Sequence, residues 1–284
     1  MKDWKSNKIV DIKKYFENSL TTIYSIGETQ SIFKILIESK LGLSQKDLII
    51  NPDLKISESE VLQIQFALKR LLKNEPIQYI LGETQFFDLK IKVTPSVLIP
   101  RPETEELVNW VLEDVKVSSQ VSILDACSGS GCIAIALKSN LPNAKITGVD
   151  ISKEALSIAK QNAQLNKVII DFVEDNMLDS TMKERYEIIV SNPPYVSREE
   201  AIQMQDNVLK YEPHLALFPE SEDVLIFYKS IFKFALKSGS KWVYFEVNQY
   251  KEEELINWLK LENVTDFTFK NDISGNLRFL KISF

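Results

Sequence analysis

The chain has 284 residues, 44% of them hydrophobic and 26% charged, with a formal net charge of −6. These values exclude a disordered or fibrous chain and are typical of globular proteins. Two cysteines exclude a disulfide framework, and the single histidine, His214, excludes a Cys/His zinc cluster, so we expect no metal site. The polar start and the lack of an apolar run of about 18 residues predict a cytoplasmic protein without a membrane partner.

The charges are distributed unevenly along the chain. Positions 1–74 hold 12 basic and 9 acidic residues, whereas positions 75–284 hold 22 basic and 31 acidic ones. A protein that tracks nucleic-acid phosphates is expected to carry a basic face, and no lysine and arginine cluster of that kind occurs. We therefore expect no direct nucleic-acid binding.

The first part of the chain has the pattern of helices. Apolar residues recur at helical spacing from residue 7 to about 73, and Ser57 with Glu60 forms a capping box before one helix. This predicts a small helical-bundle domain over residues 1–74. Strand-type alternation and three prolines follow, which predict a β-hairpin connector over residues 75–101.

From residue 102 onward, strands alternate with helices. This order predicts an α/β domain over 102–284, with a mostly parallel sheet covered on both faces and an antiparallel pair at one edge. The strands are expected at 121–125, 146–150, 168–173, 188–191, 242–247, 264–270 and 277–284, and the helices at 132–139, 153–166, 224–236 and 252–261.

A glycine-containing loop, residues 125–131, joins the first of these strands to its helix. Glycine lets the backbone approach a ligand closely. Asp150 ends the next strand, where nucleotide-binding βαβ units place an acidic side chain against ribose hydroxyls. Asp175 and Asn176 end the third strand and are candidates to flank an adenine. The loop alone also satisfies a permissive dinucleotide fingerprint, and a glycine turn without a ligand is a third interpretation.

The fourth strand, 188–191, is followed by an Asn-Pro-Pro-Tyr corner at residues 192–195. Two prolines fix φ and offer no N–H, so the corner presents acceptors. The side-chain oxygen of Asn192 and the main-chain oxygen of Pro193 can together accept both hydrogens of one NH2 group, and Tyr195 offers a face for stacking. Methyl transfer to nitrogen uses such a corner and hydride transfer does not, although an ordinary turn is the structural alternative.

The loop and the corner together resemble the S-adenosylmethionine-dependent amino-methyltransferases, and more narrowly the protein-(glutamine-N5) methyltransferases that act on peptide chain release factors. Adenine-N6 and cytosine-N4 DNA methyltransferases share the corner. Residues 75–82, 98–105 and 211–217 are similar to segments of the release-factor enzymes alone, and the resemblance spans nearly the whole chain.

The resemblance implies a Rossmann-like seven-stranded methyltransferase sheet, a helical domain that recognises release factors, and S-adenosyl-L-methionine as the cofactor. Cys127 occupies a position that is usually glycine in the family, and Asn176 one that is aromatic in some members. The implied substrate-binding residues are Asn192, Pro193, Pro194 and Tyr195. The implied cofactor-binding residues are Cys127, Ser128, Gly129, Ser130, Gly131, Asp150, Asp175, Asn176 and Asn192.

By resemblance the acceptor is the glutamine of the Gly-Gly-Gln motif in class 1 peptide chain release factors. Asn192 is expected to orient its amide, Pro193 to accept through its carbonyl and Tyr195 to pack against it. A nucleic-acid amino-methyltransferase and a non-catalytic cofactor-binding adaptor are the alternatives. Four residues are left with open roles: Arg101 and Thr104 close over the cofactor or cap a helix, His214 is a base or a loop residue, and Glu246 faces the cleft or solvent.

Overall fold

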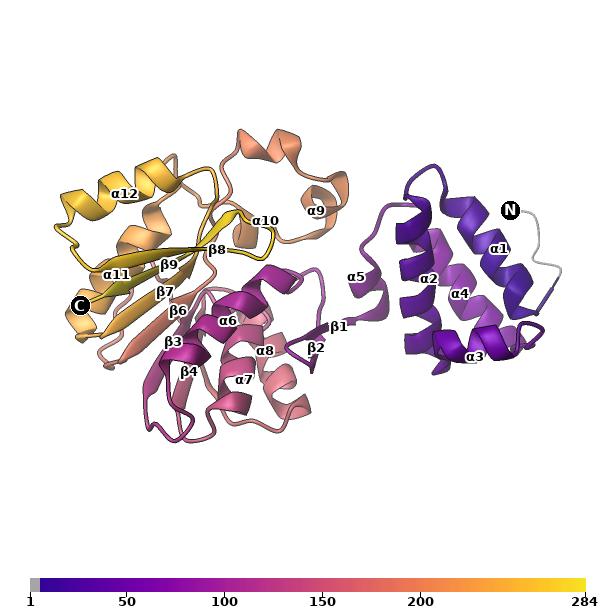
Figure 1. The fold of residues 1–284 in the computed structure, drawn as a ribbon, viewed down its shortest axis with the longest axis horizontal. Helices are drawn as coiled ribbons and strands as arrows, with labels where there is room; N and C mark the ends of the chain where they lie inside the picture. The colour runs from indigo at the N-terminus through magenta and orange to yellow at the C-terminus, as the bar shows by residue number, and fades with distance from the viewer. Residues whose placement is uncertain (1–5) are drawn as a thin grey trace. The chain divides into compact units, whose positions relative to one another are not determined.

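The computed structural model describes residues 6–284 and divides into two compact units (Figure 1). The helical unit runs to Gly82 and includes Asp206–Tyr211, and the α/β unit comprises Glu83–Gln205 and Glu212–Phe284. None of the helices within residues 6–284 combines the length and apolar character that a membrane span requires.

The helical unit is built around an apolar core in which the rings of Phe16 and Phe33 meet edge to face, 5.2 Å apart. Serines cap three of its helices, and the predicted capping box is confirmed because the Ser57 and Glu60 side chains each accept the other's backbone N–H. Its helices are α1 (Ile9–Leu20), α2 (Ile26–Leu41), α3 (Gln45–Ile50), α4 (Glu58–Leu71), α5 (Ile77–Leu81) and α9 (Asp206–Tyr211).

The α/β unit begins with a hairpin, β1 (Glu83–Phe86) and β2 (Leu89–Lys92). Phe87 and Asp88 turn it with φ of 53° and 59°, the left-handed conformation that tight hairpins need. Its helices are α6 (Pro102–Asp114), α7 (Cys132–Asn140), α8 (Lys153–Leu165), α10 (His214–Leu217), α11 (Ile226–Ser238) and α12 (Glu252–Leu261), with a 3₁₀ turn at Glu200–Gln203.

A seven-stranded sheet forms the centre of the α/β unit, as predicted. The strands lie in the order β5-β4-β3-β6-β7-β9-β8, and β9 runs antiparallel to the six others. Figure 1 shows this sheet with most of its strands labelled. They are β3 (Ser122–Ala126), β4 (Lys145–Asp150), β5 (Asp171–Glu174), β6 (Ile188–Ser191), β7 (Trp242–Glu246), β8 (Phe267–Asn271) and β9 (Leu277–Ser283).

Helices cover both faces of this sheet, because successive strand residues point to opposite faces. On one face, Val243 packs in a core that includes Tyr228 of α11 and Trp258 of α12. On the other, Tyr244 meets Trp110 of α6 edge to face, with ring centroids 5.6 Å apart. The polar ends of the parallel strands are therefore left as the place for a ligand.

The predicted start of the third strand at residue 168 is wrong, because the helix end uses those residues. Lys167 takes a left-handed φ of 57°, and Val168 donates its N–H to the carbonyl of Ala163. Ile169 is exposed, and the pairing with β4 covers only Asp171–Glu174. Val168 therefore belongs to the turn that caps α8, and residues 169–170 join that turn to the strand.

Candidate functional site

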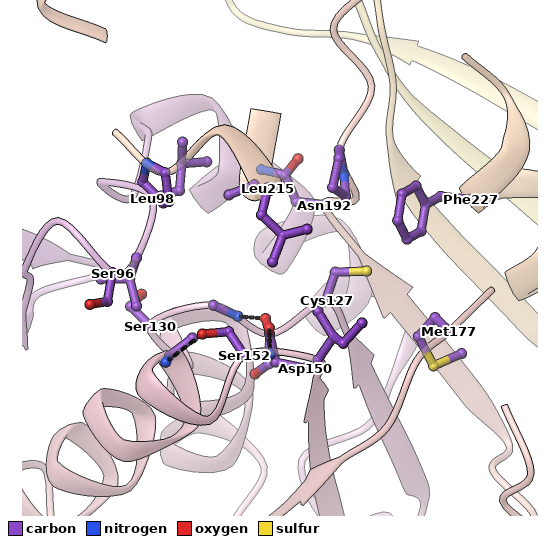
Figure 2. Close-up of a pocket in the computed structure, with 18 of the residues that line it drawn as sticks. Ser96, Leu98, Cys127, Ser130, Asp150, Ser152, Met177, Asn192, Leu215 and Phe227 are labelled. Carbon is purple, nitrogen blue, oxygen red and sulfur yellow. Dashed lines mark hydrogen bonds between the residues drawn. The ribbon is translucent and has the colours of Figure 1, made fainter. Parts of the chain in front are cut away.

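The candidate site lies at the carboxyl ends of β3, β4 and β6. The chain proceeds outward from β3 to β4 and β5 and then returns to β6 on the other side of β3. Ligands bind at such a switch point in open α/β sheets. A cavity of about 370 Å³ opens there, within the range of small-molecule sites (Figure 2).

Strand register brings the glycine loop and the Asn-Pro-Pro-Tyr corner together. Ala126 of β3 pairs with Ser191 of β6, whose hydroxyl donates to the Ala126 carbonyl over 2.6 Å. Cys127 and Asn192 therefore leave adjacent strands side by side, and both line the cavity (Figure 2). Two motifs that are about 65 residues apart in the sequence thus form one site.

The loop adopts a glycine-like backbone even where it has no glycine. Cys127, Gly129 and Gly131 have φ of 62°, 53° and 78°. A Cβ at Gly131 would lie 3.0 Å from Ala159 and 3.1 Å from Phe172, so only glycine fits there. Cys127 keeps the left-handed conformation that is usual for glycine, at a cost of roughly 1–2 kcal/mol.

Asp125 holds the glycine loop through hydrogen bonds, a role that was not predicted from the sequence. Its Oδ2 accepts from the Ser128 hydroxyl (2.7 Å) and from the N–H of Ala134 in α7 (3.1 Å). Its Oδ1 is buried and has no partner within residues 6–284. Burial raises the pKa of Asp125 to about 7.

Asp150 lies on the cavity wall and holds the same loop from the side. Its two oxygens accept from the N–H of Gly129 (2.8 Å) and of Ser152 (2.9 Å) (Figure 2). Burial raises the pKa of this carboxyl. A carboxylate has about four acceptor positions, so acceptor capacity remains for a ligand diol.

Asp175 and Asn176 form the next part of the wall. Asp175 accepts from the Asn176 N–H (2.8 Å) and the Ser180 hydroxyl (2.6 Å), and the Asn176 side-chain oxygen accepts from the N–H of Leu178 (3.0 Å). These bonds shape a polar turn beside apolar wall residues, among them Met177 and Phe227 (Figure 2). This part of the cavity wall therefore combines hydrogen-bond acceptors with apolar side chains.

The corner is joined to residues whose roles the sequence left open. Asn192 Nδ2 donates to Thr104 Oγ1 (3.2 Å), and Thr104 Oγ1 donates to Glu246 Oε2 (2.6 Å). The Tyr195 hydroxyl donates to the other oxygen, Glu246 Oε1 (3.0 Å). Asn192 and Pro194 line the cavity, whereas Pro193 and Tyr195 lie outside its wall.

Glu246 is a buried carboxyl at the end of β7, with 2% exposure. Burial raises its pKa, and the hydroxyls of Thr104 and Tyr195 oppose this shift by bonding the charged form. Ser191 pairs with Phe245, so Glu246 lies in register beside Asn192. The sequence signal was a charged residue that ends an otherwise apolar strand.

Arg101 and Glu212 join the segments 98–105 and 211–217, which form the cavity wall opposite Asp150. The Arg101 guanidinium bonds Glu212 Oε1 over 2.5 Å, and Glu212 Oε2 accepts from the N–H of Ile99 (3.2 Å). Leu98 and Leu215, one from each segment, lie across the cavity from Asp150 (Figure 2). The ion pair therefore holds the cover of the cavity in place.

His214 begins α10 and is exposed. Its ring meets Phe218 edge to face, with centroids 5.6 Å apart, and it lies outside the cavity wall. This placement matches a helix start and brings no base to the corner.

Known proteins are similar to both parts of the chain. Residues 11–82 match the model described as the PrmC N-terminal domain, and residues 106–215 match the Methyltransferase small domain. The release factor glutamine methyltransferase of Flavobacterium psychrophilum is 46% identical, covering 96% of this chain and 99% of that protein. The corresponding enzyme of Bacteroides thetaiotaomicron is 38% identical, covering 95% and 98%.

Solved structures agree on the fold. The human Mettl16 catalytic domain, crystallised with an RNA hairpin from the MAT2A 3′UTR, has a TM-score of 0.57 at 18% identity, covering 80% of this chain and 81% of that one. The human methyltransferase 10 domain containing protein has a TM-score of 0.53 at 18% identity, covering 79% and 97%. Identity this low shows a shared methyltransferase fold, while the near full-length relatives show the family. The chain belongs to the release factor glutamine methyltransferases and is an S-adenosylmethionine-dependent methyltransferase.

Proposed function

We propose that this protein methylates the side-chain amide nitrogen, N5, of the glutamine in the Gly-Gly-Gln motif of class 1 peptide chain release factors. The observation that carries the proposal is the acceptor corner, with Asn192 on the wall of the cavity at the switch point. The names of the full-length relatives support a release-factor glutamine as the acceptor.

The cavity fits S-adenosylmethionine by the chemistry of its walls. Asp150 has free acceptor positions for the ribose diol, and loop residues 127–131 bring backbone close to the ligand. Asp175 and Asn176 offer polar contacts for the adenine beside the apolar surface of Phe227. When bound, the cofactor supplies an electrophilic methyl group with a good leaving group.

The residues of the corner do the remaining work by orientation. A carboxamide nitrogen is a poor nucleophile because its lone pair is delocalised into the carbonyl. Asn192 Oδ1 and the Pro193 carbonyl accept its two hydrogens, which turns the nitrogen toward the methyl group and stabilises the positive charge that develops there. Tyr195 lies outside the cavity wall, and its bond to Glu246 supports the corner that would hold the amide. No strong base is required.

We further propose that the helical domain recognises the release factor. The sequence predicts it at residues 1–74, with 75–101 as connector and 102–284 as methyltransferase domain, and the compact helical unit extends to Gly82. We also propose that the protein acts in the cytoplasm. We expect it to bind no nucleic acid directly, since its net charge is −6. A nucleic-acid amino-methyltransferase is disfavoured by the near full-length relatives, which are release-factor enzymes.

The test is acceptor mapping with labelled S-adenosylmethionine. A class 1 release factor should take up one methyl group, found on the Gly-Gly-Gln glutamine by mass spectrometry, and a release factor with that glutamine changed to alanine should take up none. Label on another residue, or faster methylation of an adenine-containing oligonucleotide, would overturn the proposal.

A further inference from the structure

The acceptor corner is the end of a buried chain of hydrogen bonds. Asn192 Nδ2 donates to Thr104 Oγ1 over 3.2 Å, Thr104 Oγ1 donates to Glu246 Oε2 over 2.6 Å, and Tyr195 donates to Glu246 Oε1 over 3.0 Å. Thr104 and Glu246 are each 2% exposed. Water therefore does not compete for the bonds that join them.

The number of hydrogen-bond donors among these side chains determines the direction in which each hydrogen bond points. A threonine hydroxyl has one proton, and an ionised carboxylate only accepts. Since the Thr104 hydroxyl donates its only hydrogen bond to Glu246, it can only accept a hydrogen bond from Asn192. The amide must then turn its NH2 group toward Thr104, which leaves Oδ1 at the other end.

We infer that Thr104 and Glu246 are positioning residues that set the polarity of the Asn192 amide, so that its oxygen faces the glutamine NH2. This inference rests on the proposed function. The reversed amide would present its own NH2 to the NH2 of the substrate, and two donors do not bond. The sequence does not reveal this arrangement, because Thr104 is 88 residues from Asn192 and 142 from Glu246.

The ionised form of Glu246 supports this arrangement, because both of its oxygens only accept. A protonated Glu246 can donate a hydrogen bond to the Thr104 oxygen. The Thr104 hydroxyl can then donate a hydrogen bond to Asn192 Oδ1, which stabilises the reversed amide. Burial raises the pKa of Glu246, so this reversal begins at a higher pH than for an exposed glutamate. The titratable groups around it come from five places in the fold: Glu103 of α6, Cys132 of α7, Tyr195 of the corner, Tyr228 of α11 and Arg278 of β9.

The first experiment replaces the hydroxyl and keeps the shape. With saturating cofactor and release factor, Thr104→Val should lower kcat by about tenfold, and Thr104→Ser should restore most of it. The dissociation constant of S-adenosylhomocysteine, measured by calorimetry, should change less than about twofold for both. Thr268→Val, at an exposed position on β8, is the matched control and should leave kcat unchanged.

The second experiment tests whether Thr104 acts through Asn192. In ¹⁵N spectra of the full chain with bound S-adenosylhomocysteine, the Asn192 side-chain NH2 signal is the one that Asn192→Asp removes. This signal should shift in Thr104→Val and stay unmoved in Thr268→Val. Glu246→Gln should shift the same signal, lower kcat at least as much as Thr104→Val, and remove the acidic limb that Glu246 contributes to the pH profile of kcat.

The outcomes separate this inference from the proposed function. If wild type leaves the release-factor glutamine unmethylated, the proposed function fails whatever the spectra show. The inference is overturned if wild type methylates the glutamine but Thr104→Val keeps full kcat. It is also overturned if the Asn192 NH2 signal does not shift in Thr104→Val or in Glu246→Gln. Loss of kcat in Thr104→Val together with a lower melting temperature and no rescue by Thr104→Ser would also overturn it, because that pattern marks a packing role.

Discussion

The two walls that meet at the site are built differently. On the cofactor side, the bonds that shape the glycine loop join residues close in sequence, since Asp125 bonds positions 3 and 9 residues away and Asp150 reaches Gly129 over 21. On the acceptor side, Asn192 depends on Thr104, 88 residues away. The bonds that shape the glycine loop therefore span at most 21 residues and two adjacent strands, whereas the acceptor wall depends on contacts across most of the assembled unit.

This difference predicts that the two walls can be damaged separately. Changes at the acceptor corner should slow the transfer and leave cofactor binding intact. Changes at the glycine loop or Asp150 should do the reverse, because those residues line the part of the cavity that we assign to the cofactor.

Asn192→Ala should have the largest effect. It removes one of the two acceptors that orient the amide, so we expect kcat to fall by about 10³-fold, in the range seen when an oxyanion-hole donor is lost. Binding of S-adenosylhomocysteine should weaken less than about threefold, as measured by calorimetry. The exposed Asn143→Ala serves as the control, and a large loss of cofactor affinity in Asn192→Ala would contradict the separation of the walls.

Asp150→Asn should have the opposite signature. It removes the negative charge offered to the ribose diol and places an NH2 where the carboxylate accepts a backbone N–H. We expect the cofactor to bind about 10- to 100-fold more weakly, while kcat at saturating cofactor stays within about threefold of wild type. Calorimetry and steady-state kinetics measure the two, with the exposed Asp171→Asn as control. A fall in kcat without a change in affinity would contradict the assignment.

Gly131→Ala should weaken the loop through its fit against Ala159 and Phe172. The added Cβ meets both at 3.0–3.1 Å in a left-handed backbone, so we expect a loss of about 1–3 kcal/mol in the free energy of unfolding. Gly275→Ala is the matched control, since its φ is 86° and no atom lies within 4 Å of its Cβ. Urea unfolding measures both, and equal losses would mean that backbone strain alone matters at Gly131.

Asp125 predicts a smaller effect that depends on pH. Its folded-state pKa is raised to about 7, so the folded protein favours the neutral form. The stability from this group is full below its usual pKa and is lost as the pH rises through the folded value. From pH 6 to pH 8 the free energy of unfolding of wild type should fall by about 1.4 kcal/mol relative to Asp125→Asn. Urea unfolding at the two pH values measures the difference, and parallel changes in the two proteins would contradict the shift.

Local sequence predicted much of the fold. The strand 188–191 and the helix 252–261 lie at their predicted bounds, because a short apolar run before prolines and an amphipathic stripe are both local signals. The third strand was misplaced because the apolar run at 168–170 is typical of a strand as well as of a helix end, and only the bond from Val168 to Ala163 decided between them.

The amino-acid sequence by itself determined the glycine loop, the acidic strand end and the Asn-Pro-Pro-Tyr corner, since backbone restrictions at glycine and proline act on adjacent residues. Tertiary structure decided what surrounds them. Thr104, Glu246 and the Arg101–Glu212 pair acquire partners through strand order and helix packing. A buried hydrogen bond depends on which distant side chains the sheet brings within about 3 Å, and no short stretch of sequence contains that information.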